Sequence, residues 1–242
     1  MKANVNVSGG QVDRVKTHWE SVAETTRWGR YISEVELRAV TRAANLAAGP
    51  DVLLDVGCEG GRWSKLLVDA GWKAICTDIN PEALQLCAER IPSAKCILVT
   101  PKDELLPCDD QSVSMILCFE VTAVIRTGWF IGEAARVLKR SGMLVGVFNN
   151  RSSIRGFVHH QVSSLLGRFD WYESTYSGWR KKLTGAGFRV IHEEGICWFP
   201  FNRYSDHPLV TLCTKAEKLL GLRKLARFSP WIVFLARKDG VE

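Results

Sequence analysis

Long apolar runs are missing from this sequence: none approaches the roughly 20 residues that a helix needs to cross a bilayer, and the first residues lack the apolar segment of a secretory signal. No internal repeat or low-complexity segment is present. The eight cysteines include no C-x-x-C pair and no cysteine–histidine group at zinc spacing. We therefore expect a cytoplasmic protein with reduced thiols and no bound metal.

What is present is an ordinary globular composition. The length of 242 residues and the apolar fraction of 46% suit one α/β domain with a sizeable core. The formal net charge of +6 permits an anionic or phosphate-bearing partner. It is too modest to indicate nucleic-acid binding, which we do not expect.

The most informative segment is 53–64, where an apolar strand breaks into a glycine-rich turn and a helix opens at once. Glycines let the backbone approach a ligand closely, and the start of the helix offers unpaired N–H groups. The segment therefore predicts a turn that cradles a nucleotide. Cys58 lies within it, either as a small buried filler or as a reactive thiol.

The spacing of the glycines decides which nucleotide is expected. The dinucleotide fingerprint needs Gly where this turn has Gly57, Glu59 and Arg62, so two of its three positions fail. The pattern is instead D-x-G-x-x-x-G, from Asp55 through Gly57 to Gly61. It resembles the class I S-adenosylmethionine (SAM) dependent methyltransferases, type 11 in particular, whose first motif usually reads D-x-G-x-G-x-G. Glu59 departs from that motif, and an NAD-linked oxidoreductase is the disfavoured alternative.

A carboxylate follows at the expected distance. Asp78 ends the predicted strand 73–78, lies 21 residues after Gly57, and is followed by Ile79. A carboxylate there can accept hydrogen bonds from both ribose hydroxyls. NAD enzymes share this feature, and a helix N-cap is the structural alternative for the residue.

Two more stretches, 105–121 and 134–147, extend the resemblance. It implies that Phe119 and Glu120 reach the SAM pocket. It also implies an acidic residue near the adenine, where Lys102 occupies the matching offset and Asp103 serves if the loop shifts by one residue.

Strands and helices alternate along the chain, which predicts a parallel sheet covered on both faces. The resemblance implies a Rossmann-like seven-stranded sheet whose last strand is antiparallel. We expect a single methyltransferase domain spanning 1–242, with an N-terminal helical cap at 11–47, a SAM-binding core at 48–148 and acceptor-side insertions with the last strands at 149–242. The expected strands lie near 51–56, 73–78, 95–99, 112–119, 143–148, 188–193 and 231–237, and the helices near 61–70, 81–90, 128–139 and 176–184.

Three regions outside the core are expected to hold the acceptor specificity: the cap, 149–171 and 196–228. The cap is expected to fold over the cofactor so that Tyr31 or Arg30 meets the methionine carboxylate; the alternative is a helix packed through Trp19 and Trp28. On a helix, the leucines of segment 215–228 would share one face and leave its cations on the other. Such a helix either contacts an anionic membrane surface or packs on the domain.

Methyl transfer from a sulfonium mainly requires alignment and exclusion of water. A hydroxyl acceptor also needs a base, and His18, His159 and His160 are the candidates, each with a structural role as the alternative. Glu120 is a further candidate that otherwise lines the SAM site. No N-P-P-Y signature of base or glutamine methylation follows the fourth strand. The sequence thus predicts a methyltransferase for a small-molecule or lipid-like acceptor, with a non-catalytic SAM-binding module as the alternative.

Overall fold

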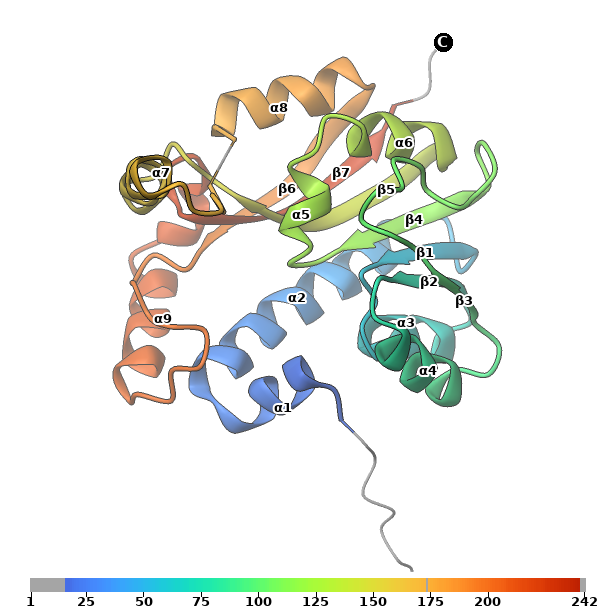
Figure 1. The fold of residues 1–242 in the computed structure, drawn as a ribbon, viewed down its shortest axis with the longest axis horizontal. Coiled ribbons are helices and arrows are strands. Elements are labelled where there is room, and N and C mark those ends of the chain that lie inside the picture. Colours follow the sequence, from blue (N-terminus) through green and yellow to red (C-terminus); the bar gives the residue numbers. More distant parts are fainter. Residues whose placement is uncertain (1–15, 173, 240–242) are drawn as a thin grey trace, which may run out of the picture.

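A seven-stranded sheet of order β3-β2-β1-β4-β5-β7-β6 forms the centre of the molecule (Figure 1). The computed structural model describes residues 16–172 and 174–239. Strands β1 to β5 are parallel, and β7 runs antiparallel between β5 and β6, which confirms the predicted sheet. The strands are β1 Val52–Val56, β2 Lys73–Asp78, β3 Lys95–Leu98, β4 Val113–Cys118, β5 Leu138–Asn149, β6 Phe188–Ile196 and β7 Trp231–Lys238.

Helices cover both faces of the sheet (Figure 1). Neighbouring residues of β1, Leu53 and Leu54, point into opposite cores and are both fully buried, as expected for a strand in a parallel sheet. Helices α2, α3 and α4 pack on one face, and α5, α6 and α8 on the other. The helices are α1 His18–Thr25, α2 Arg27–Leu46, α3 Arg62–Asp69, α4 Pro81–Arg90, α5 Thr122–Ile125, α6 Phe130–Val137, α7 Ile154–Leu166, α8 Tyr176–Gly185 and α9 Leu209–Leu219.

The start of β5 differs from the prediction. The strand begins at Leu138, not near 143, and α6 ends at Val137. Leu138 pairs with Val113, and a register shift precedes the next pair, Met115 with Met143. The basic segment after α6 is therefore a bulged strand start, because pairing with β4 outweighs helix propensity there.

The prediction of one helix over 215–228 is also wrong. Helix α9 ends at Leu219, and Gly221 adopts a left-handed conformation at φ 67°. Two short 3₁₀ helices follow, η1 Leu222–Lys224 and η2 Ala226–Phe228. Glycine at this position ends the helix because it enters the left-handed region at little cost.

The N-terminal cap consists of α1 and α2, and residues 11–15 of the predicted cap lie outside the described residues. Thr17 and Glu20 form a capping box at the start of α1. Arg90 of α4 holds the Glu20 carboxylate through two hydrogen bonds of 2.6 and 2.9 Å. These contacts fix α1 over the C-terminal ends of the central strands.

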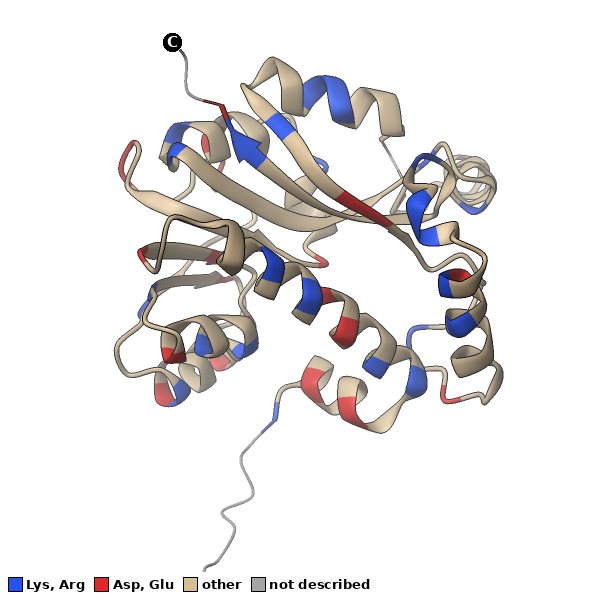
Figure 2. Ribbon diagram, turned by 180° about the vertical axis from the view of Figure 1, so that it is seen from behind, with Lys and Arg blue, Asp and Glu red and all other residues tan. Residues whose placement is uncertain are grey.

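Basic and acidic residues are interspersed over the ribbon in Figure 2; on α2 the acidic residues lie in the middle, with basic residues on either side. Within residues 16–172 and 174–239, no helix is both long enough and apolar enough to cross a bilayer.

Candidate active site

A cavity of about 590 Å³ opens at the C-terminal ends of β1, β2 and β4, beneath α1 and α2. Its walls join the β1 turn, the end of β2 and the loop after β3 to residues of the cap. The sequence-predicted residues that line it are Asp55, Gly57, Glu59, Asp78, Ile79, Asp103, Phe119, Glu120 and His18. Crevices at the carboxyl ends of parallel strands are the usual ligand sites of such folds.

The β1 turn is tightly tied to β2. The amides of Gly57 and Cys58 both donate to the Thr77 carbonyl, at 2.8 and 3.0 Å. Gly57 has φ 67°, and a Cβ there would lie 2.4 Å from a methyl group of Val121. Gly61, at φ 71°, begins α3 and is not among the lining residues. Both glycines are required by conformation and by close approach.

Glu59 keeps the left-handed backbone that a glycine would normally provide, at φ 50°. Its side chain accepts a hydrogen bond of 3.1 Å from the Trp19 amide at the start of α1. A Cβ on Gly60 would lie 2.5 Å from a methyl group of Thr17, so Gly60 allows α1 to approach the turn. Glu59, the residue that departs from the motif, therefore links α1 of the cap to the β1 turn.

Asp78 faces the cavity with its carboxylate. One oxygen accepts from the Glu59 amide and the other from the Asn80 amide, both at 2.9 Å. The N-cap of α4 is Asn80, so the structural alternative for Asp78 does not hold. Each carboxylate oxygen keeps acceptor capacity for a ligand hydroxyl.

The loop after β3 supplies Asp103 to the cavity, while Lys102 lines a different hollow. Asp103 accepts a 2.6 Å hydrogen bond from the Thr100 amide, which holds the loop. Beneath the turn, Asp55 is buried and accepts a 2.7 Å hydrogen bond from Ser64. Burial raises the pKa of Asp55 to about 7.

Glu120 lies at the end of β4 with a left-handed backbone, at φ 56°. Arg203 donates a 2.7 Å hydrogen bond to its carboxylate, and the Arg203 guanidinium lies 5.1 Å from the ring of Trp19 and 5.2 Å from that of Trp231. Burial raises the pKa of Glu120, and the charge of Arg203 opposes this. Arg203 comes from the connection between β6 and α9, and the sequence analysis did not single it out.

Glu36 of α2 is a cavity residue that the sequence analysis missed. It is 4% exposed, accepts from Arg62 at 2.9 Å and from the Trp63 indole at 3.1 Å. Burial, followed by the charge of Glu120, raises the pKa of Glu36 to about 8. The sequence does carry a signal: Glu36 stands between Ile32 and Val40 on the apolar face of α2, where a carboxylate is out of place.

The structure places Tyr31 away from the cavity, which corrects its prediction. Its hydroxyl donates to Glu217 at 2.6 Å and accepts from the Cys197 amide at 3.2 Å. Tyr31 thus joins α2 to α9, and burial raises its pKa well above the usual value. Arg30, the second candidate, is exposed and pairs with Asp206. Trp19 and Trp28 both line the cavity, so the cap still covers it.

Of the three candidate histidines, only His18 lines the cavity. His159 and His160 lie on α7, contact Asp170 at 3.3 and 2.5 Å, and do not line the cavity. Their prediction as bases has no geometric support, because the carboxylate of Asp170 holds both rings. His18 does line the cavity, with its Nε2 3.4 Å from the Tyr204 hydroxyl.

The sheet order and the cavity at the β1 turn define a class I methyltransferase fold. The methyltransferase domain family matches residues 54–146. A SAM-dependent methyltransferase of Mesorhizobium loti has a similar fold, with a TM-score of 0.61 and 13% identity over 86% of this chain and 99% of that one.

The related proteins of known sequence are also described as methyltransferases or methyltransferase-like. An uncharacterised methyltransferase-like protein of Schizosaccharomyces pombe is 28% identical over 63% of this chain and 58% of its own length. An uncharacterised methyltransferase of Mycobacterium tuberculosis is 30% identical over 51% of this chain and 49% of its own. The chain thus spans about half the length of these relatives. Residues 54–146 thus match a type 11 methyltransferase domain, and the SAM-dependent family of that domain implies SAM as cofactor.

Proposed function

We propose that the protein transfers a methyl group from SAM to a small-molecule or lipid-like acceptor by in-line displacement. The observation that carries this proposal is the continuity of the cavity. It extends from Asp78 and the β1 turn to aromatic and carboxylate side chains beneath the cap. A cofactor and a compact acceptor therefore share one space, which is what direct transfer requires.

The residues of the β1 turn fit the cofactor. Asp78 has acceptor capacity for the ribose hydroxyls, Asp103 and Ile79 border the adenine side, and Gly57 leaves the backbone open to close approach. SAM supplies an electrophilic methyl group on a positively charged sulfonium. Carboxylates around the cavity complement that charge, Glu59 and Glu120 among them.

Residues beneath the cap serve the acceptor side. Trp19 and Trp28 narrow the cavity and exclude water. His18 and Glu36 are the groups placed to take a proton from the acceptor, and the raised pKa of Glu36 suits proton transfer near neutral pH. We place the acceptor specificity in the cap, 11–47, and in the insertions of 149–242.

An exposed apolar surface supports a lipid-like acceptor and peripheral contact with an anionic membrane. On α7, Ile154 and Leu165 are 87% and 83% exposed. Leu219 at the end of α9 is 85% exposed, and Phe228 of η2 is 58% exposed. Asn150, before α7, donates to the Arg227 carbonyl at 2.8 Å, so the two segments adjoin (Figure 1). We call the exposed apolar residues of α7 and of 219–228 the α7–η2 surface. The same stretches of chain carry exposed cations, in 215–228 and at Arg168 after α7.

The proposal is tested by incubating the protein with methyl-labelled SAM and a fractionated extract of metabolites and lipids. We expect label in one organic-soluble or small-molecule fraction, and none with Asp78→Ala or with excess S-adenosylhomocysteine. SAM binding without labelling of any fraction would favour a non-catalytic SAM-binding module.

A further inference from the structure

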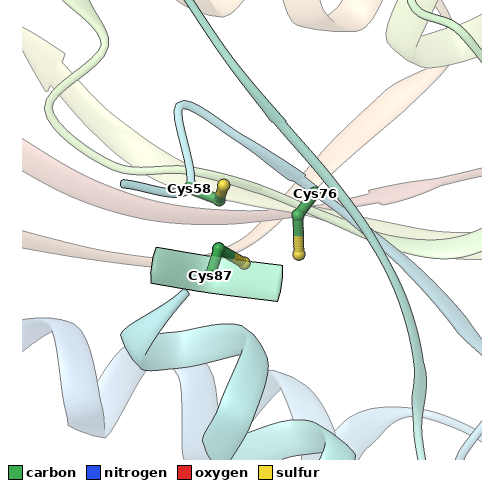
Figure 3. Close-up of side chains that lie close together, drawn as sticks. All are labelled: Cys58, Cys76 and Cys87. Carbon is green, nitrogen blue, oxygen red and sulfur yellow. The ribbon is translucent and has the colours of Figure 1, made fainter. Parts of the chain in front are cut away.

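Three thiols from distant parts of the sequence meet behind the β1 turn (Figure 3). Cys58 comes from the turn, Cys76 from β2 and Cys87 from α4. Their sulfur atoms all lie within 4.8 Å of one another, and all three residues are buried. Their separations in sequence match no zinc-site spacing, which is why the sequence alone does not bring them together.

The surroundings contain a fourth sulfur. Cys96 of β3 is the register neighbour of Cys76 in the parallel β2–β3 pair, is half-buried, and interacts with Cys76 and Cys87. A Cβ on Gly61 would lie 2.6 Å from the Cys87 sulfur, so the turn itself closes over the group. The Cys96 sulfur is not within 4.8 Å of all three, so β3 places a fourth thiol beside the group rather than in it.

We propose that Cys58, Cys76 and Cys87 bind one thiophilic metal ion, with Zn²⁺ as the expected ion and with Cys96 completing the site after a side-chain rotation. Sulfur is the preferred donor of soft and borderline ions. A Zn–S distance of about 2.3 Å separates the sulfurs of a tetrahedral site by about 3.8 Å. The three sulfurs of Cys58, Cys76 and Cys87, now within 4.8 Å of one another, reach that spacing by small side-chain rotations. Binding releases the thiol protons to solvent and leaves four thiolate ligands.

The site would join the turn that carries Gly57 to β2 and α4 by metal–ligand bonds. Cys58 lines the cavity, and its carbonyl accepts a 2.8 Å hydrogen bond from the Gly61 amide. A bound ion would therefore hold the cofactor turn in its binding conformation. The inference concerns metal binding alone and does not depend on methyl transfer.

The test uses the full chain, purified under reducing conditions and titrated with Co²⁺, whose tetrahedral thiolate complexes are intensely coloured. We expect one equivalent per chain, displaced by one equivalent of Zn²⁺. Losing a residue that only hydrogen-bonds a metal ligand weakens metal affinity by about 10–100-fold. Cys76→Ser or Cys87→Ser removes a ligand itself, so each should weaken Co²⁺ binding by more than that. Cys213→Ser, on α9, is the matched control and should bind as the wild type.

Cys58→Ala provides a second ligand variant, because alanine keeps a small apolar side chain and removes the sulfur. Circular dichroism confirms that each variant is folded. A folded, reduced wild type that binds neither Co²⁺ nor Zn²⁺ stoichiometrically would overturn the proposal, as would undiminished binding by Cys58→Ala and Cys87→Ser. A disulfide between two of these cysteines in freshly isolated protein would also overturn it, in favour of a redox role.

Discussion

At the residue scale, two glutamates have left-handed backbones at the cavity. Glu59 and Glu120 have φ 50° and 56°, which a non-glycine residue adopts only when its surroundings impose it. Glu59 is held by the Trp19 and Asp78 contacts, and Glu120 by Arg203. Both strained residues present carboxylates where the sulfonium is expected, so the strain coincides with the proposed chemistry.

Asp78→Ala should weaken SAM binding by about 10–100-fold, because hydrogen bonds to a charged group contribute about 1.5–3 kcal/mol. Calorimetric titration measures this. Asp69→Ala is the control, since Asp69 is an exposed partner of Lys65 on α3. Equal affinities for wild type and Asp78→Ala would contradict the ribose assignment.

Glu36 gives a prediction for the pH dependence of stability. Its folded pKa of about 8 exceeds its usual value of 4.5, so the native state holds the proton over that interval. The contribution to the free energy of unfolding is complete below 4.5 and is lost as pH rises through about 8. Urea unfolding of wild type should therefore show a steeper loss of stability over this range than Glu36→Gln, and identical profiles would refute the shift.

At the element scale, α1 is fastened to the cofactor half by side chains rather than by sheet pairing. Arg90 is the main anchor, with side chains of the Arg90–Glu20 pair only 17% and 12% exposed. Arg90→Met should make the α1 amides exchange faster with deuterium and weaken SAM binding several-fold. Arg189→Met, which breaks an exposed pair with Asp239, should change neither. Unaltered deuterium exchange of the α1 amides in Arg90→Met would show that α1 is held in place without Arg90.

The elements differ in how well the sequence predicts them. The β1 turn and Asp78 were predictable because glycine geometry and strand-end carboxylates act locally. The end of α9 was not, because exposed Leu219 and Leu220 continue a helical pattern that Gly221 interrupts. The roles of Tyr31 and the cysteine group depend on contacts between distant segments, which periodicity does not encode. Periodicity does mark Glu36 as a carboxylate on the apolar face of α2, but it does not identify Arg62 and Trp63 as its partners.

At the scale of the whole molecule, one sheet carries both the cavity and the α7–η2 surface, since α7 follows β5 and η2 precedes β7. If that surface contacts membranes, the protein should float with anionic vesicles at low salt and less so as salt rises. Leu219→Glu with Leu220→Glu should abolish flotation. Leu98→Glu, at a 57% exposed leucine on β3, should not. Flotation that both variants retain would remove the membrane assignment.

The measurement that tests the central claim most directly is calorimetric titration of the purified protein with SAM and S-adenosylhomocysteine, with NADH as the comparison. The account predicts stoichiometric binding of both sulfur compounds and none of NADH, because Glu59 and Arg62 replace the glycines that a pyrophosphate needs. Binding of NADH without binding of SAM would contradict it.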